Sequence, residues 1–183
     1  MIFRNIWGVF ILLLFNMVYH SLAKNGSNDT MCSGQHLILH PLKLYSSCGA
    51  TLEKVETQKA PTVAYPKVEE GSYNLFILIM VDPDASPNPN LYWLHWLKTN
   101  ISYADVKDGI DAESTDQMVY RGPSPPSGIH RYQFFLYGEN VNKFKPPPVQ
   151  AGNRLFDFIK FEESNELKVI SSFQYLVSAK SKI

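Results

Sequence analysis

Residues 73–81 read Y-N-L-F-I-L-I-M-V, and D-P-D follows directly at residues 82–84. The nearly continuous apolar run has the length and the residue types of a buried β-strand. Asp82-Pro83-Asp84 ends it, because proline lacks the N–H donor that a central strand needs. This stretch predicts a sheet whose core strand stops abruptly at polar residues.

Further predicted strands lie on both sides of this run, divided by turns rich in proline. They are Thr51–Val55, Thr62–Tyr65, Tyr92–Ile101, His130–Tyr137 and Val169–Val177, and apolar residues at helical spacing predict one helix at Asn153–Glu163. The sequence has no repeat and no regular alternation of strands and helices. The pattern predicts a mainly β fold, an antiparallel β-sandwich with one or two short helices.

The charges of the chain cancel, since 17 Lys plus Arg stand against 17 Asp plus Glu among 183 residues. No global electrostatic attraction therefore favours nucleic acid or an anionic membrane as the main partner. The length suits one domain, and a hydrophobic share of 45% is enough to build its core. We expect any recognition to come from a local site.

The first 23 residues differ in composition from the rest. Arg4 precedes an apolar run at residues 6–15, and small residues at Ser21 and Ala23 form a cleavage pattern. A membrane anchor is the alternative, but a span needs about 20 apolar residues, and this run is shorter. We expect residues 1–23 to be a cleaved signal peptide, which makes the protein secreted and extracellular, with no stable membrane span.

Three sequons agree with secretion, at Asn25, Asn28 and Asn100. Two of them lie in the polar residues 24–36, which we expect to form a flexible, glycosylated segment before a single domain at residues 37–183.

Cys32 and Cys48 are the only cysteines. An even count in an oxidising compartment favours one disulfide, worth about 3 kcal/mol in the chain-entropy picture. Two free buried thiols are the alternative. No C-x-x-C pair and no Cys/His spacing indicates structural zinc or dithiol redox chemistry.

Polar residues gather at the ends of the most apolar strands. They are Asp82, Asp84, His95, His130, Arg131 and Tyr132. Each has an ordinary structural explanation: turn chemistry for the two aspartates, a satisfied core position for His95, a strand cap for His130, and an ion pair with either aspartate for Arg131. Together they are costly to bury unless they satisfy one another or a ligand.

Two imidazoles, a tyrosine hydroxyl and turn N–H groups suit a phosphate or a carboxylate. Asp82 could orient a histidine and raise its pKa, favouring a doubly protonated ring. The same groups could serve acid–base catalysis, but no nucleophile stands in an elbow motif. No short-spaced pair of ligands supports a metal site, so we expect no metal, no cofactor and no catalytic residues.

Four short motifs resemble the phosphatidylethanolamine-binding protein family in order and spacing. They are D-P-D-A at residues 82–85, H-W-L at residues 95–97, G-P-S-P-P at residues 122–126 and G-I-H-R-Y at residues 128–132. The resemblance covers about residues 51–173. With its signal peptide and the Y-W-L-H-W form of residues 92–96, the chain is most similar to the secreted branch, typified by phosphatidylethanolamine-binding protein four.

The resemblance implies a β-sandwich with a small anion site near one end. It implies a ligand-binding set of Asp82, Trp93, His95, Pro125, Pro126, His130 and Tyr132, with Asp84 and Arg131 as structural support. It also implies binding of phospholipid head groups such as phosphatidylethanolamine or of other small anions. It implies no particular catalytic activity, so we expect a non-enzymatic protein. Contact with a protein partner such as a protease or a receptor, as an inhibitor or signalling modulator, is the alternative.

The sequence departs from the family pattern in three places. Ser86 stands where the family usually has proline, and Tyr92 stands where many members have an acidic residue. The sequence also ends at Ile183, soon after the last predicted strand. We therefore expect no C-terminal helix over the anion site, which would be more open.

Overall fold

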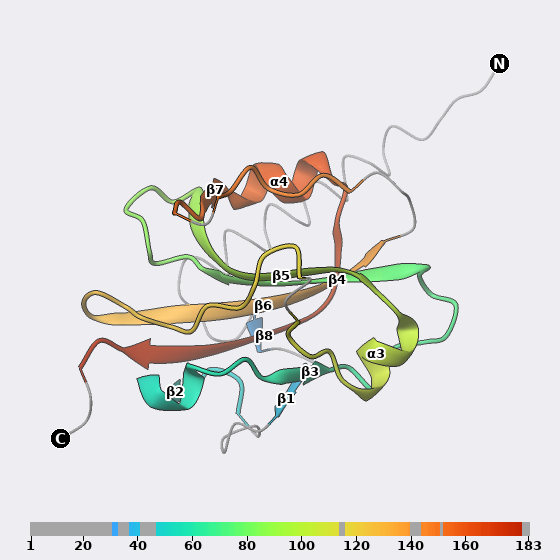
Figure 1. Ribbon diagram of the computed structural model, residues 1–183, viewed down its shortest axis with the longest axis horizontal. Helices are drawn as coiled ribbons and strands as arrows, with labels where there is room; N and C mark the ends of the chain where they lie inside the picture. The colour runs from blue at the N-terminus through green and yellow to red at the C-terminus, as the bar shows by residue number, and fades with distance from the viewer. Residues whose placement is uncertain are drawn as a thin grey trace.

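The computed structural model describes residues 31–32, 37–40, 47–113, 116–139, 144–150 and 152–180. The strands are β1 Ile38–His40, β2 Thr51–Leu52, β3 Thr62–Ala64, β4 Leu75–Asp82, β5 Leu91–Ile101, β6 Ile129–Glu139, β7 Leu155–Asp157 and β8 Lys168–Ser178. The helices are the 3₁₀ helix η1 Lys54–Thr57, and the α-helices α3 Tyr103–Asp108 and α4 Phe158–Ser164. The prediction of a mainly β fold with short helices is confirmed (Figure 1).

Six strands form one sheet in the order β2-β8-β6-β4-β5-β7, and β1 pairs with β3 in a separate two-stranded sheet. All pairings within the larger sheet are antiparallel except that of β2 with β8, which is parallel. The apolar run at residues 73–81 contributes most of β4, which lies between β5 and β6.

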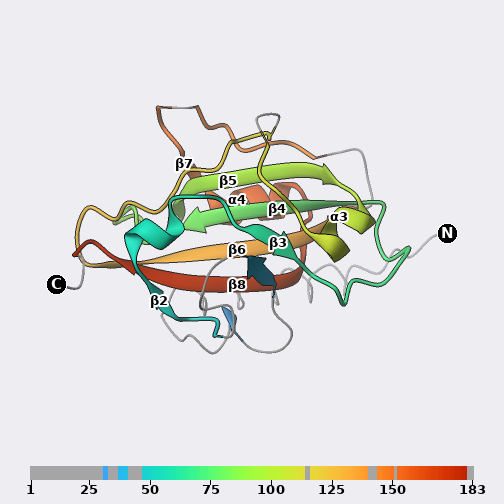
Figure 2. The same ribbon diagram turned by 60° about the horizontal axis from the view of Figure 1, so that its bottom comes forward.

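The two faces of the large sheet are covered by different elements. In Figure 2, β3 and α3 lie in front of the sheet and α4 lies behind it. Side chains of β4 alternate between these two layers: Phe76, Leu78 and Met80 face the first, and Ile77, Ile79 and Val81 face the second. Because both faces are buried, this strand reads as a continuous apolar run.

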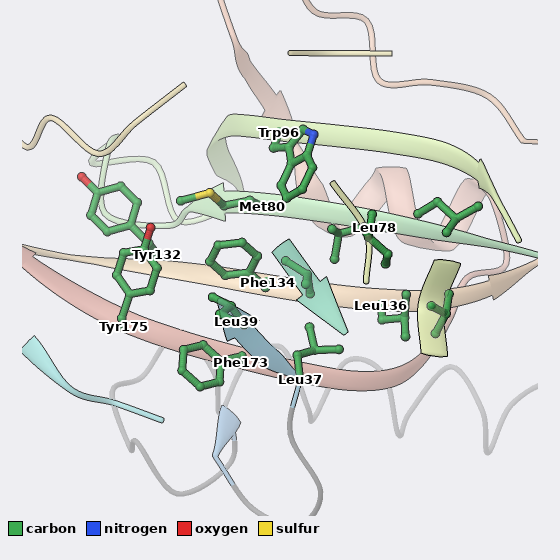
Figure 3. Packing of buried hydrophobic residues seen from close by; sticks show 14 of the residues in the cluster. Leu37, Leu39, Leu78, Met80, Trp96, Tyr132, Phe134, Leu136, Phe173 and Tyr175 are labelled. Carbon is green, nitrogen blue, oxygen red and sulfur yellow. The ribbon is translucent and has the colours of Figure 1, made fainter. Parts of the chain in front are cut away.

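The first layer contains the core that positions the site. Figure 3 shows Leu37, which directly precedes β1, and Leu39 of β1 packed below Met80 and Phe134 of the large sheet. Burying such side chains supplies most of the folding free energy, at roughly 25 cal/mol for each Å² of apolar surface removed from water. The sheet on this face is therefore a rigid base for the residues at the ends of its strands.

Two predicted elements differ from the structure, and one element of the structure was not predicted. The predicted helix at Asn153–Glu163 is a strand over Leu155–Asp157, paired with β5, and a helix only from Phe158. The change occurs at Asp157, whose carboxylate accepts the Lys160 N–H at 3.0 Å and so caps the helix.

The predicted strand at Thr51–Val55 stops at Leu52, because the next residues turn into η1. A third element, α3, was not predicted, although Ser102 and Asp105 form a capping box at its start.

The predicted disulfide between Cys32 and Cys48 is confirmed, with a Cα–Cα distance of 5.4 Å. Next to it, Met31 is 1% exposed, and its carbonyl accepts the Ser172 hydroxyl at 3.1 Å. The bond therefore fastens residues 31–32 against β8.

No helix in the described ranges is long and apolar enough to cross a bilayer. The expected signal peptide and the sequons at Asn25 and Asn28 lie outside the described residues. Asn100 is exposed near the end of β5, with a φ of 56°.

Candidate functional site

Asp82 and His130 form a buried ion pair at the ends of neighbouring strands. Asp82 closes β4 and His130 is the second residue of β6, so their side chains meet, with Asp82 Oδ2 2.8 Å from His130 Nδ1. The side chains are 4% and 10% exposed. Burial raises the pKa of the Asp82 carboxyl, although the hydrogen bond and charge of His130 oppose that rise.

Asp84 and Arg131 form a second ion pair beside the first. The Asp84 carboxylate accepts the Arg131 backbone N–H at 2.9 Å, Nε–H at 2.9 Å and Nη2–H at 2.6 Å. Burial raises the pKa of Asp84, but the hydrogen bonds and charge of Arg131 together outweigh it and hold the pKa below its usual value. Of the two aspartates considered for Arg131, the structure assigns it Asp84.

The turn between the two aspartates links the pairs. Asp82 Oδ1 accepts the Asp84 N–H at 2.7 Å, the local bond that Asp-x-Asp turns make. Successive residues of β6 point to opposite faces, so His130 and Arg131 diverge and each meets a different aspartate. The D-P-D motif is thus both turn chemistry and part of the site.

A β-bulge in β5 aims His95 at the same region. Met80 pairs with Trp96 and Val81 with Leu94, which leaves His95 as an extra residue between them. Its ring meets that of Tyr132 edge to face, with the centroids 5.1 Å apart. We call Asp82, His95, His130 and Tyr132 the polar cluster.

Backbone bonds hold His95 firmly. Its Nδ1 lies 2.6 Å from the Arg121 carbonyl, and its own carbonyl accepts the Arg121 N–H at 2.9 Å. The buried Arg154 donates from Nη1 to the carbonyls of His95 at 3.2 Å and Val119 at 3.1 Å. Sequence reasoning missed Arg154, because nothing near it in the chain marks it as a partner of β5.

Burial lowers the pKa of His95 to about 4, and the charges of Arg154, Arg121 and His130 add to that effect against the Arg121 backbone bond. His95 is therefore neutral at pH 7. Asp82 contacts His130 and not His95, so the expected carboxylate-supported ring is His130 alone.

Tyr132 closes the polar cluster on the core side. Its ring stacks on Tyr175 with the centroids 5.7 Å apart, and Figure 3 shows the two side by side at one end of the core. Its buried hydroxyl makes no hydrogen bond of good geometry within the described ranges. Burial and the charge of Asp82 raise its pKa well above the ordinary value, against a smaller opposing effect of the Ser124 backbone, so the hydroxyl keeps its proton.

The remaining predicted site residues are Trp93, Pro125 and Pro126. Trp93 is half-buried, and the Arg121 guanidinium lies 6.0 Å from its ring centroid. Pro125 is buried and Pro126 exposed in the loop that follows Arg121. That Trp93, Pro125 and Pro126 line a ligand site stays a prediction.

The arrangement offers three unoccupied polar groups. Neither His95 Nε2 nor His130 Nε2 hydrogen-bonds to a described residue, and both side chains keep a small exposed fraction. With the Tyr132 hydroxyl they can donate to, and accept from, a small polar ligand. In the described part of the chain, no group of three or more His, Cys, Asp or Glu is arranged to hold a metal ion.

Comparison with known proteins identifies relatives over most of the chain. Residues 40–173 match the family model described as Phosphatidylethanolamine-binding protein. The rice (Oryza sativa subsp. japonica) Protein MOTHER of FT and TFL1 homolog 2 is 45% identical over 88 residues, covering 44% of this chain and 47% of that protein. Arabidopsis thaliana Protein FLOWERING LOCUS T is 41% identical over 78 residues, covering 39% and 42%. These matches span less than half the length of either curated relative.

Solved structures share the fold at lower identity. The carboxypeptidase Y inhibitor, in complex with its cognate proteinase, superimposes with a TM-score of 0.64 at 20% identity, covering 92% of this chain and 95% of that one. The phosphatidylethanolamine-binding protein from Plasmodium vivax gives a TM-score of 0.57 at 20% identity, covering 72% and 78%.

Proposed function

The chain belongs to the phosphatidylethanolamine-binding protein family, and on this premise we propose that it is a non-enzymatic binding protein for small phosphate-bearing anions, such as the phosphoethanolamine head group. The observation that carries the proposal is the polar cluster, in which two histidine Nε2 atoms hydrogen-bond to no described residue and the buried Tyr132 hydroxyl makes no hydrogen bond of good geometry within the described ranges. Buried polar groups that stay unpaired cost free energy, and a ligand that pairs with them recovers it.

Charge in the neighbourhood favours an anion. The Arg154 guanidinium donates to the His95 carbonyl, and the positive charges of Arg154 and Arg121 both act on the His95 ring. The negative charge of Asp84 is already matched by Arg131. One phosphate is therefore attracted locally even though the chain as a whole is neutral.

Binding rather than catalysis follows from the residue types. Covalent catalysis commonly uses a serine or a cysteine that a histidine activates, and the polar cluster contains neither residue type. We accordingly propose no reaction for the site.

Titration calorimetry with phosphoethanolamine tests the proposal. We expect millimolar or tighter binding to the wild type and a loss of about tenfold or more in His130→Asn, which keeps a hydrogen-bond donor toward Asp82 but removes Nε2. Asp84→Asn serves as the matched control and should bind normally. Equal affinity in wild type and His130→Asn would refute the site.

We further propose that the protein is a secreted glycoprotein of the branch typified by phosphatidylethanolamine-binding protein four. The Cys32–Cys48 disulfide supports this, because such bonds persist in oxidising compartments. The exposed Asn100 is accessible to a glycan. Mass spectrometry of the protein from a secreting cell line should show a mature N-terminus at residue 24, and a protein retained with residues 1–23 would contradict secretion.

A second candidate function is inhibition of a protease or modulation of a receptor through loop contacts. The observation in its favour is the similarity of fold to the carboxypeptidase Y inhibitor. The exposed parts of residues 86–90 and 120–128 would then form the contact surface. This function predicts that His130→Asn keeps full inhibitory activity, whereas the anion-binding function is lost in the same variant.

A further inference from the structure

We infer that the site takes its anion with at least one proton still attached, as protonated inorganic phosphate or a singly protonated phosphate monoester whose P–OH donates to Nε2 of His95. The inference rests on the proposed function, since it specifies which form of the anion fits. It separates phosphate from sulfate, which has the same shape but no proton to give near neutral pH.

The hydrogen-bonding of His95 fixes its tautomer. Its Nδ1 lies 2.6 Å from the Arg121 carbonyl oxygen, which can only accept a hydrogen bond. Nδ1 therefore carries the ring hydrogen, and Nε2 of the neutral ring has a lone pair and no hydrogen. Because Nε2 has no partner among the described residues, that lone pair is available to a ligand.

The surroundings of His95 keep the ring neutral. The groups that act on it are the cations Arg121 and Arg154, His130, and the neutral hydroxyl of Tyr132. A second proton on His95 would be buried near these positive charges, and no carboxylate of the described residues hydrogen-bonds to the ring to offset them. The lowered pKa of His95, about 4, agrees with this geometry.

The rest of the polar cluster supplies donors. His130 binds Asp82 through Nδ1, so its Nε2 points away from that carboxylate and is left for the ligand, and Tyr132 keeps its hydroxyl proton. A singly protonated phosphate matches this set: its bare oxygens accept from His130 and Tyr132, and its P–OH donates to His95. A fully ionised phosphate would direct an oxygen lone pair at the Nε2 lone pair, which disfavours it.

The first test compares inorganic phosphate with sulfate at pH 6 by chemical-shift titration. We expect phosphate to bind about tenfold or more tightly than sulfate, because the analogue leaves the His95 acceptor unpaired. In His95→Asn the side-chain amide can still donate to the Arg121 carbonyl, but the Nε2 acceptor is gone. The preference for phosphate should then fall to about twofold or less.

The matched control is His130→Asn, which should weaken both anions together and leave their ratio unchanged. Sulfate also reports any titration of the protein itself, because its own charge is constant over this pH range. Where His95→Asn does not fold, the wild-type pH series still decides.

The second test is that pH series with phosphoethanolamine, a monoester, and glycerophosphoethanolamine, a diester that stands for the intact lipid head group. The second pKa of a phosphate monoester is about 6, so its protonated form declines about tenfold for each pH unit above that value. Between pH 6.5 and 8, the ratio of monoester affinity to sulfate affinity should fall by about the same factor as the protonated fraction of the monoester. The ratio of diester affinity to sulfate affinity should not change.

Two results would overturn the inference while leaving anion binding in place. One is a ratio of phosphate affinity to sulfate affinity near one in the wild type, and the other is a monoester affinity that rises with pH. Failure of every anion to perturb the polar cluster would instead refute the proposed function.

Discussion

Two ion pairs join the same two segments of the chain, and they differ in what they leave free. The Asp84–Arg131 pair uses the carboxylate three times, and its side chains are 27% and 16% exposed. The Asp82–His130 pair is more deeply buried, at 4% and 10%, yet His130 makes one hydrogen bond and leaves Nε2 without a described partner.

The difference separates a structural role from a binding role. A saturated pair near the surface fixes two loops and offers a ligand nothing more. When a buried pair leaves one polar atom without a partner, the bonds within the protein do not offset the full cost of removing that atom from water. We therefore assign ligand binding to Asp82 and His130, and positioning to Asp84 and Arg131.

Breaking the buried pair should have the largest effect. His130→Ala leaves the Asp82 carboxyl group buried without its hydrogen-bond partner, so we expect the free energy of unfolding to fall by about 3 kcal/mol and phosphoethanolamine binding to be lost. Urea denaturation and calorimetry measure the two effects. A variant that binds normally would remove His130 from the site.

Removing the disulfide should destabilise the whole protein without acting selectively on either ion pair. Cys32→Ser with Cys48→Ser opens a loop with a sequence separation of 16, which costs about 3 kcal/mol. We expect a lower melting temperature but unchanged phosphoethanolamine affinity well below it. A selective loss of binding would show that residues 31–32 also shape the site.

Breaking the surface pair should affect stability and spare binding. Asp84→Asn removes the charge from three hydrogen bonds of a partly exposed group, and we expect a loss of about 1 to 2 kcal/mol. Thermal unfolding gives the stability, and calorimetry should give a dissociation constant within about twofold of wild type. A binding defect as large as that of His130→Ala would erase the contrast between the pairs.

Lowering the pH should have a smaller effect on the free energy of unfolding, and this effect reports that His95 is neutral in the folded protein. Its folded pKa, about 4, lies below the ordinary 6.5, so between these values the unfolded chain binds a proton that the folded protein does not. The contribution of His95 to the free energy of unfolding is fully present above pH 6.5. It declines as the pH falls, by about 1 kcal/mol from pH 7 to pH 5.5.

Denaturation curves over that range, compared with His95→Asn, isolate the effect. The raised pKa of Asp82 acts in the opposite sense, because a carboxyl that gains its proton more readily when folded gains stability as pH falls. A pH dependence that is the same in His95→Asn and wild type would contradict a neutral His95.

The sequence predicted the strands better than the contacts between them. The run that forms β4, the polar residues that end it, and the disulfide followed from residue type and spacing. The identities of the polar cluster also followed, through the family motifs at residues 82–85, 95–97 and 128–132.

What could not be predicted depends on register between distant strands. The bulge that turns His95 toward Tyr132 exists only in the pairing of β5 with β4. The choice of Asp84 for Arg131 depends on the alternation of β6 against the turn after β4. Arg154 reaches His95 from a segment about 60 residues later, which no local pattern indicates.

The central claim is that the polar cluster binds a phosphate-bearing anion through the two free histidine nitrogens. Nitrogen-15 NMR of the imidazole rings during titration with phosphoethanolamine tests it most directly. We predict that Nε2 of His95 and of His130 shift in a saturable manner, that their Nδ1 signals shift less, and that His40 on β1 does not respond. Unchanged Nε2 signals at millimolar ligand, or equal changes at His40, would contradict the claim.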